Sequence, residues 1–144
     1  MNTPSRAYAE INLDAILHNM SQMQRILQPG TKIMPVIKAD AYGHGAVMVS
    51  RKLQELGAEM LAVACLAEAM ELRQGGITIP ILCLGQTPVE RADDLLEYHV
   101  TQTVGELEYG RALSAAAEKA GTKLPIHIKL DTGMGRLGFL WREG

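Results

Sequence analysis

The chain has 144 residues, a length typical of one domain and sufficient to bury a hydrophobic core. Hydrophobic residues make up 47% and charged residues 21%, which excludes a disordered or fibrous class. The formal net charge is −2 and no block of Lys or Arg occurs, so the sequence predicts a small-molecule partner and no binding to nucleic acid or to a membrane surface.

The hydrophobic pattern predicts an opening unit followed by a regular alternation of strands and helices. A short alternating strand, AYAEINL (residues 7–13), precedes an amphipathic helix from Leu13 to Leu27, which Pro29 and Gly30 stop. The predicted strands that follow are KIMPVIK (32–38), MLAVAC (60–65), IPILCLG (79–85), VTQTV (100–104) and LPIHIKL (124–130). The predicted helices between them cover residues 46–56, 66–74, 89–98 and 106–120.

Strands joined by helices of this length predict right-handed crossovers and a parallel sheet. An open doubly wound sheet and the first part of a (β/α)8 barrel, which needs about 250 residues, both fit this order. In PIHIKLD (125–131) polar and apolar residues alternate, so one face of the strand is polar, which suits a barrel mouth better than a covered central strand. We therefore expect an α/β fold, an incomplete TIM-type barrel with about five of its eight parallel strands. Residues 1–144 are expected to be the amino-terminal part of that barrel domain.

The stretch VIKADAYGHG (36–45) places a lysine, Lys38, at the carboxyl end of a strand, where ligands bind in parallel α/β folds. A lysine amine that is partly desolvated there becomes a nucleophile toward carbonyl groups. The alternative is a lysine whose stem covers apolar surface while its amine stays in water. Tyr42 and His44, in the same loop, either donate to a phosphate or face solvent.

The stretch KLDTGMGRLGF (129–139) contains glycines in the order GxGxxG, at Gly133, Gly135 and Gly138. A dinucleotide-binding fingerprint needs a helix at its third glycine and an acidic residue about 20 positions further on. The following FLWREG has no helical pattern, so this interpretation is rejected. The glycines instead predict a tight turn that carries Arg136 over a pocket as a bidentate donor for a carboxylate or phenolate. The alternative is a surface ion pair between Arg136 and Asp131.

The other histidines, serines and cysteines of the chain predict no further catalytic or metal site. The histidines lack HxH or HxxxH spacing and no GxSxG element occurs, so no metal site or serine nucleophile is expected. Cys65 and Cys83 stand in apolar runs without a CxxC neighbour, and both are predicted to be reduced core residues. With no long apolar run and no signal-peptide pattern, the sequence predicts a cytoplasmic protein.

Two motifs together identify a family resemblance. VIKADAYGHG closely resembles the cofactor-lysine signature of bacterial alanine racemases, and HIKLDTGMGRLGF (127–139) resembles a second signature of that family. The resemblance extends over essentially the whole chain, including AEINLDAILHN (9–19), but covers less than half of a typical member. It implies that the carboxyl-terminal β-domain of the family lies outside these residues.

The resemblance implies roles for four residues and a cofactor, pyridoxal 5′-phosphate. Lys38 would carry the cofactor as an internal aldimine and serve as the base on one face of the substrate. Tyr42 would contact the cofactor phosphate. Arg136 would bind the substrate carboxylate and approach the cofactor phenolic oxygen. Lys129 stands where some members have a carbamylated lysine that orients this arginine.

The implied activity is that of a cytoplasmic, homodimeric isomerase that interconverts L-alanine and D-alanine by two-base proton exchange and supplies D-alanine for peptidoglycan. In the family the second base is a tyrosine from the partner subunit's carboxyl-terminal domain. None of the chain's tyrosines matches that motif, so the 144-residue chain alone is expected to be inactive. The alternatives are a non-catalytic cofactor-binding carrier barrel, a non-functional fragment whose unpaired edge strands favour self-association, and a different Schiff-base enzyme. A preference for alanine or serine stays open.

Overall fold

The computed structural model describes residues 7–141, which alternate between helices and strands as predicted. The helices are α1 (Leu13–Ile26), α2 (Lys38–Gly43), α3 (Ala46–Glu55), α4 (Leu66–Gln74), the 3-10 helix η1 (Val89–Arg91), α5 (Ala92–Glu97) and α6 (Leu107–Lys119). The strands are β1 (Leu61–Val63), β2 (Ile81–Cys83), β3 (Val100–Val104), β4 (Ile126–Ile128), β5 (Leu130–Asp131) and β6 (Phe139–Leu140).

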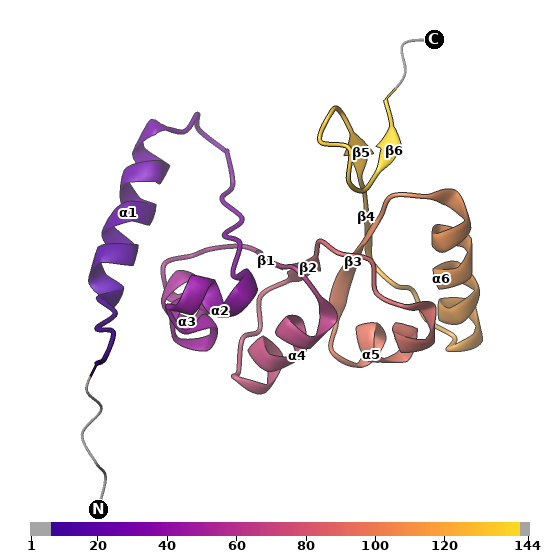
Figure 1. Ribbon diagram of the computed structural model, residues 1–144, viewed down its shortest axis with the longest axis horizontal. Helices are drawn as coiled ribbons and strands as arrows, with labels where there is room; N and C mark the ends of the chain where they lie inside the picture. Colours follow the sequence, from indigo (N-terminus) through magenta and orange to yellow (C-terminus); the bar gives the residue numbers. More distant parts are fainter. Residues whose placement is uncertain (1–6, 142–144) are drawn as a thin grey trace, which may run out of the picture.

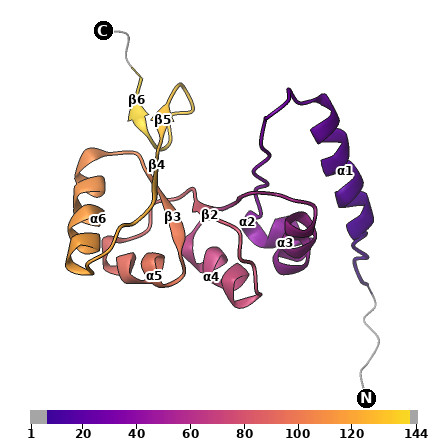
Figure 2. The ribbon, with the colours of Figure 1, turned by 180° about the vertical axis from the view of Figure 1, so that it is seen from behind.

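The main sheet is parallel, with its strands in the order β1-β2-β3-β4. Val36 extends the sheet beyond β1 through a single parallel bridge to Ala62. In Figure 1, α3, α4, α5 and α6 form an arc along one side of these strands, and Figure 2 shows the same arrangement from behind. A doubly wound sheet has helices on both faces, so the arrangement confirms the predicted partial barrel.

Alternation along the strands separates two faces of the sheet. Leu61, Val63 and Ile81 belong to the core cluster that the strands form with the helices. Thr103 points to the other face, which in a barrel is the interior, because successive side chains of a strand alternate. His127 pairs in register with Thr103 and therefore shares this interior face. The polar face predicted for the last strand is thus the interior one.

The structure corrects two predictions in the amino-terminal part of the chain. The predicted strand 32–38 is reduced to the bridge at Val36, where Ile37 donates to the Ala62 carbonyl and Ala62 donates to the Pro35 carbonyl. Pro35 has no N–H group and cannot extend the ladder. The strand expected before α1 is also absent, since residues 7–12 are in no strand and Tyr8 is exposed.

The predicted strand 124–130 divides in two. β4 ends the main sheet, and β5 leaves it to pair in parallel with β6, at residues where no element was predicted. The amide of Phe139 donates to the Lys129 carbonyl at 2.9 Å, and the amide of Trp141 donates to the Asp131 carbonyl at 3.1 Å. The segment between β5 and β6 is therefore closed at its base by backbone hydrogen bonds.

Both cysteines are free thiols, but only Cys83 is a core residue. Cys65 is exposed because β1 ends at Val63 and Cys65 is the residue that precedes α4, so its predicted core position is wrong. Between residues 7 and 141, none of the helices has both the length and the apolar character needed to cross a membrane.

Candidate functional site

Lys38 is presented by a left-handed turn. The four residues after it, 39–42, have φ of 51–53° and ψ of 42–50°, and α2 is therefore one turn of the opposite hand to an ordinary α-helix. None of these residues is glycine, and the left-handed conformation costs roughly 1–2 kcal/mol for each such residue. A strained backbone of this kind persists only where surrounding contacts hold it, and such places are often functional.

Hydrogen bonds at both ends hold this turn. The Glu68 carboxylate, on α4, accepts a hydrogen bond of 2.8 Å from the amide of Ala39. Asp40 Oδ1 accepts one of 2.5 Å from the amide of Ala46, at the start of α3. His44 Nδ1 lies 2.8 Å from the Ala41 carbonyl, so this histidine closes the turn. Neither Glu68 nor Asp40 was identified from the sequence.

The turn brings two of the predicted residues together. The Nζ atom of Lys38 lies 5.6 Å from the centroid of the Tyr42 ring, a cation–π distance. The Tyr42 side chain is 68% exposed, so its phenol is open to solvent beside the lysine amine. Lys38 and Tyr42 therefore form one half of the candidate site.

Arg136 lies in a second loop, residues 132–138, whose backbone conformation requires glycine at three positions. Gly133, Gly135 and Gly138 have positive φ values of 138°, 70° and 124°, as the GxGxxG spacing suggested. A Cβ atom on Gly138 would lie 2.8 Å from the Asp131 nitrogen and 3.0 Å from the Lys129 oxygen. Only a residue without a side chain fits there, because the loop returns directly onto β5.

Hydrogen bonds with the side chains of Asp131 and Lys129 hold this loop on either side of Arg136. Asp131 is buried, and its Oδ1 atom accepts hydrogen bonds of 3.0 Å from the amides of Gly133 and Gly135. The bonds from Gly135 and then Gly133 lower the pKa of the Asp131 carboxyl below its ordinary value. Lys129 Nζ donates to the Leu137 carbonyl at 2.6 Å. Both neighbours of Arg136 in the chain are therefore fixed.

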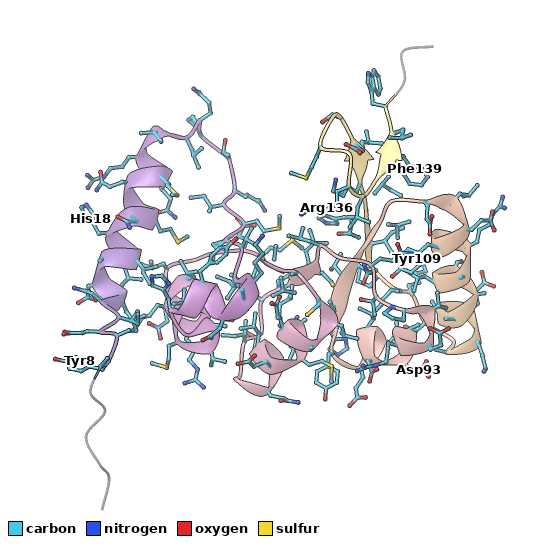
Figure 3. The ribbon with its side chains drawn as sticks, viewed as in Figure 1. Tyr8, His18, Asp93, Tyr109, Arg136 and Phe139 are labelled. Carbon is cyan, nitrogen blue, oxygen red and sulfur yellow. The ribbon has the colours of Figure 1, made fainter. Side chains whose placement is uncertain are left out.

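The Arg136 side chain is exposed and, within residues 7–141, makes no ion pair or hydrogen bond. The alternative of an ion pair with Asp131 is wrong, because no such pair is formed among residues 7–141; the Oδ1 atom of Asp131 accepts from the loop amides instead. Arg136 lines a cavity of about 280 Å³ together with Thr103, Glu106 and Asp131. Figure 3 shows it between the β5–β6 loop and the main sheet. An unpaired guanidinium on a fixed loop is suited to bind an anion.

The cavity wall contains a further polar atom without a partner. Thr103 is 7% exposed, and its Oγ1 atom has no hydrogen-bond partner in the described part of the chain. Gln86 Nε2 donates to Glu106 Oε1 at 3.2 Å across the same cavity. The arginine therefore lies among groups that can both donate and accept hydrogen bonds.

The structure does not bring Lys38 and Arg136 into contact. Lys38 follows the bridge residue Val36, and Arg136 follows β5, which continues the chain beyond the end of β4, so both lie beyond the carboxyl edge of the parallel sheet. Val36 and β4 are, however, the two outer members of the sheet, with β1, β2 and β3 between them. Lys38 does not line the cavity that contains Arg136. The candidate site thus consists of two separately built halves.

Comparison with known proteins shows which family the chain matches. The model of the alanine racemase N-terminal domain matches residues 11–144. The alanine racemase of Desulfovibrio desulfuricans is 50% identical over 131 residues, which cover 91% of this chain and 35% of that protein. The chain therefore spans about a third of the length of such curated relatives.

Solved structures agree with the sequence comparison. The alanine racemase from Clostridium difficile 630, in complex with cycloserine, matches with a TM-score of 0.88 and 46% identity, over 90% of this chain and 36% of that one. The histidine racemase from Leuconostoc mesenteroides matches with a TM-score of 0.82 and 30% identity, over 89% of this chain and 34% of that one. The matched fold is therefore found in racemases named for different amino acids.

Proposed function

Because the chain belongs to the alanine racemase family, we propose that residues 1–144 form the amino-terminal part of the pyridoxal 5′-phosphate-binding barrel of an amino-acid racemase. The proposed substrate is alanine, after which the curated relatives are named. The observation that carries the proposal is the Arg136 guanidinium, which has no partner among residues 7–141 and is held by a fixed loop beyond the same sheet edge as the Lys38 amine.

The two halves suit the two ends of a small amino acid bound to the cofactor. In an eight-stranded barrel the first and fifth strands stand opposite each other, so groups at their carboxyl ends face one another across the mouth. The sheet order gives Val36 and β4 these two positions. Closure of the barrel by further strands would therefore direct Lys38 and Arg136 toward one space.

The cofactor fits the donor groups of the Lys38 turn. A primary amine at a strand end can condense with an aldehyde, and the exposed Tyr42 phenol beside it can donate to a phosphate. Pyridoxal 5′-phosphate, when bound, stabilises negative charge at the α-carbon of an attached amino acid. We propose that Lys38 Nζ accepts the α-proton on one face of the substrate.

Arg136 is proposed to bind the substrate carboxylate through two parallel N–H···O hydrogen bonds. Its neighbours Gly135 and Leu137 are held by Asp131 and Lys129, so little conformational freedom of the backbone is lost when the carboxylate binds. The guanidinium therefore fixes the orientation of the α-carbon relative to the lysine base.

Lys129 is proposed to carry a carbamate that orients Arg136. Its nitrogen donates to the Leu137 carbonyl, and a carbamylated nitrogen keeps one N–H group for this bond. The added carboxylate replaces a positive charge close to the Arg136 loop by a negative one, which turns repulsion into attraction. A ¹³C NMR spectrum of the protein at neutral pH with ¹³C-labelled bicarbonate is expected to show a carbamate resonance that is absent in Lys129→Arg; a spectrum without this resonance in the unaltered protein contradicts the assignment.

The second base of the proposed two-base mechanism is expected to be a tyrosine from a partner subunit. Among the described residues, the tyrosine that lines the Arg136 cavity is Tyr109, whose hydroxyl donates to the Thr87 carbonyl and accepts from the Thr87 amide. Burial raises the pKa of Tyr109 to about 12, so its hydroxyl stays protonated and cannot take the α-proton. On the family resemblance, we propose a homodimer, located in the cytoplasm, that makes D-alanine for peptidoglycan.

The decisive experiment is chemical trapping on the intact protein. After incubation with pyridoxal 5′-phosphate and reduction by borohydride, peptide mass spectrometry is expected to find the label on Lys38. Lys38→Arg should abolish the label, whereas Lys32→Arg, which changes an exposed lysine at the other end of the same segment, should leave it unchanged. Label on another lysine would overturn the proposal.

Kinetics test the arginine independently of the lysine. In the full-length protein, Arg136→Lys is expected to lower kcat/KM for alanine by at least about tenfold, because an ammonium cannot donate in the bidentate geometry, while the cofactor absorbance remains. Arg111→Lys, which changes an exposed arginine on α6, is the matched control. The 144-residue chain by itself is expected to form no D-alanine from L-alanine, and measurable racemisation would contradict the proposed second base.

A further inference from the structure

Glu68 connects the Lys38 turn to the sheet by both of its carboxylate oxygens. Oε1 accepts a hydrogen bond of 2.8 Å from the amide of Ala39, and Oε2 accepts one of 2.7 Å from the amide of Ala64. Ala64 directly follows β1, and Ala39 directly follows Lys38. The carboxylate therefore bridges two neighbouring strand ends at the edge of the sheet where the candidate site lies.

The two bonds have different consequences. The bond to Ala64 is local, because Glu68 lies in the first turn of α4 and reaches back to an amide just before that helix. The bond to Ala39 spans 29 residues and is not part of the capping of α4. It is the contact by which Glu68 acts on the candidate site.

The bond to Ala39 completes the fixation of the lysine backbone. On the amino-terminal side of Lys38, the amide of Ile37 donates to the Ala62 carbonyl at 2.7 Å. On the carboxyl-terminal side, the Glu68 carboxylate holds the peptide group that joins Lys38 to Ala39. Ala39 is also the first left-handed residue, so the carboxylate acts where the strained turn begins.

We propose that Glu68 is a positioning residue for Lys38, which fixes the direction of the lysine amine by holding the Ala39 amide. This role rests on the proposed function, since it concerns the capture of the cofactor by Lys38. Hydrogen bonds to an ionised carboxylate are stronger than those between neutral groups, so one side chain can offset part of the strain of the turn.

The test measures how fast the intact protein captures pyridoxal 5′-phosphate at Lys38, by borohydride quenching at timed intervals and peptide mass spectrometry. Glu68→Ala is expected to slow the capture about tenfold, since it removes both bonds to a charged group. Glu68→Gln, which keeps one acceptor oxygen and the shape of the side chain, is expected to slow it less, and it is the variant to measure if Glu68→Ala does not fold. Glu71→Ala, one turn along the exposed face of α4, is the control and should capture at the wild-type rate.

A second variant separates positioning of Lys38 from support of α4. Glycine adopts the left-handed conformation without the penalty of a Cβ atom, so Ala39→Gly removes strain from the turn but restores no contact to α4. Added to Glu68→Ala, it is expected to recover a large part of the lost rate. No recovery, with the thermal midpoint of Glu68→Ala far below that of wild type, would assign Glu68 to α4 stability and overturn the proposal.

The outcomes distinguish this role from the proposed function. Wild-type capture at Lys38 that Glu68→Ala leaves unchanged overturns the positioning role alone. Absence of capture at Lys38 in the wild-type protein overturns the proposed function and this role with it. Amide hydrogen exchange gives a readout without cofactor: the Ala39 amide is expected to exchange faster in Glu68→Ala and at the wild-type rate in Glu71→Ala.

Discussion

The two loops that present the candidate residues reach positive φ angles by opposite means. The Lys38 turn places four consecutive residues with side chains in the left-handed region, whereas the Arg136 loop uses glycines at its positive φ positions. Glycine enters that region without strain, so the Arg136 loop stores little strain and the Lys38 turn stores much.

The loops also differ in the origin of their anchors. Asp131 and Lys129 hold the Arg136 loop from the residues just before it: Asp131 ends β5, and Lys129 lies between β4 and β5. Glu68, which holds the Lys38 turn, comes from a helix further along the chain. A loop built from glycine and local anchors is therefore largely encoded in its own segment, while a strained turn depends on the surrounding fold.

The largest effect that this comparison predicts is that of Gly138→Ala. The new Cβ atom would lie 2.8 Å from the Asp131 nitrogen and 3.0 Å from the Leu130 carbonyl carbon, and both are backbone atoms that cannot turn aside. The pairing of β5 with β6 must open, at a cost of roughly 2–4 kcal/mol. Urea unfolding of wild type and variant measures the difference.

Gly133→Ala is the matched control for that prediction. Gly133 also has a positive φ, of 138°, but a Cβ atom added there would have no neighbour within 4 Å, so only the backbone penalty of roughly 1–3 kcal/mol applies. If both variants lose the same free energy of unfolding, close packing at Gly138 plays no part, and the loop rests on backbone conformation alone.

An intermediate effect is expected from acid, through the carboxylate that holds the Arg136 loop. The hydrogen bonds from Gly135 and Gly133 lower the pKa of Asp131 in the folded protein below its ordinary value of 3.8. The carboxylate therefore contributes its full stabilisation above pH 3.8, and the contribution is lost as the pH falls through the lowered folded pKa.

Asp131→Asn tests this dependence. The amide oxygen of asparagine can still accept from the loop amides but does not titrate in this range, so the part of the acid sensitivity that belongs to Asp131 should disappear while the loop remains closed. Thermal unfolding midpoints measured from pH 6 downward, in wild type and variant, provide the comparison. Parallel curves for the two proteins would show that another carboxylate governs the acid response.

The same contrast explains how much of the structure the sequence could predict. The parallel sheet followed from the alternation of apolar strands with helices, because that pattern is a local property of each element. The pairing of β5 with β6 did not follow, since strands of two residues leave no periodicity to recognise. The shortening of the first strand could have been predicted from Pro35, which lacks the amide that a ladder needs.

One half of the candidate site could also be predicted from the sequence, and the other could not. The glycine spacing predicted the Arg136 turn, and the Asp-Thr-Gly order at 131–133 is a signal for a carboxylate that accepts from amides two residues or more further on. No comparable signal marks the Lys38 turn, because none of residues 39–42 is glycine. Glu68 could not be found from the sequence, since its bond to Ala39 spans 29 residues and depends on the adjacency of two strand ends.

The smallest predicted effect is that of Ala39→Gly in the Lys38 turn, and it is a gain in stability. Ala39 is exposed and left-handed, so Ala39→Gly removes a penalty of roughly 1–2 kcal/mol and loses no packing, while the added freedom of the unfolded chain costs roughly 0.5–1 kcal/mol. A net stabilisation of up to about 1 kcal/mol is expected, although alanine usually stabilises a protein relative to glycine.

The control is the same substitution in an ordinary helix. Ala115 is exposed within α6, and Ala115→Gly should destabilise the protein by about 1 kcal/mol. Urea unfolding of both variants measures the two changes in the free energy of unfolding, which are expected to have opposite signs. Equal destabilisation would show that residue 39 does not adopt the left-handed conformation, and the strain attributed to the Lys38 turn would then be absent. Opposite signs would show that the turn keeps alanine at this position despite a cost in stability, which is the behaviour expected of a segment shaped by its function.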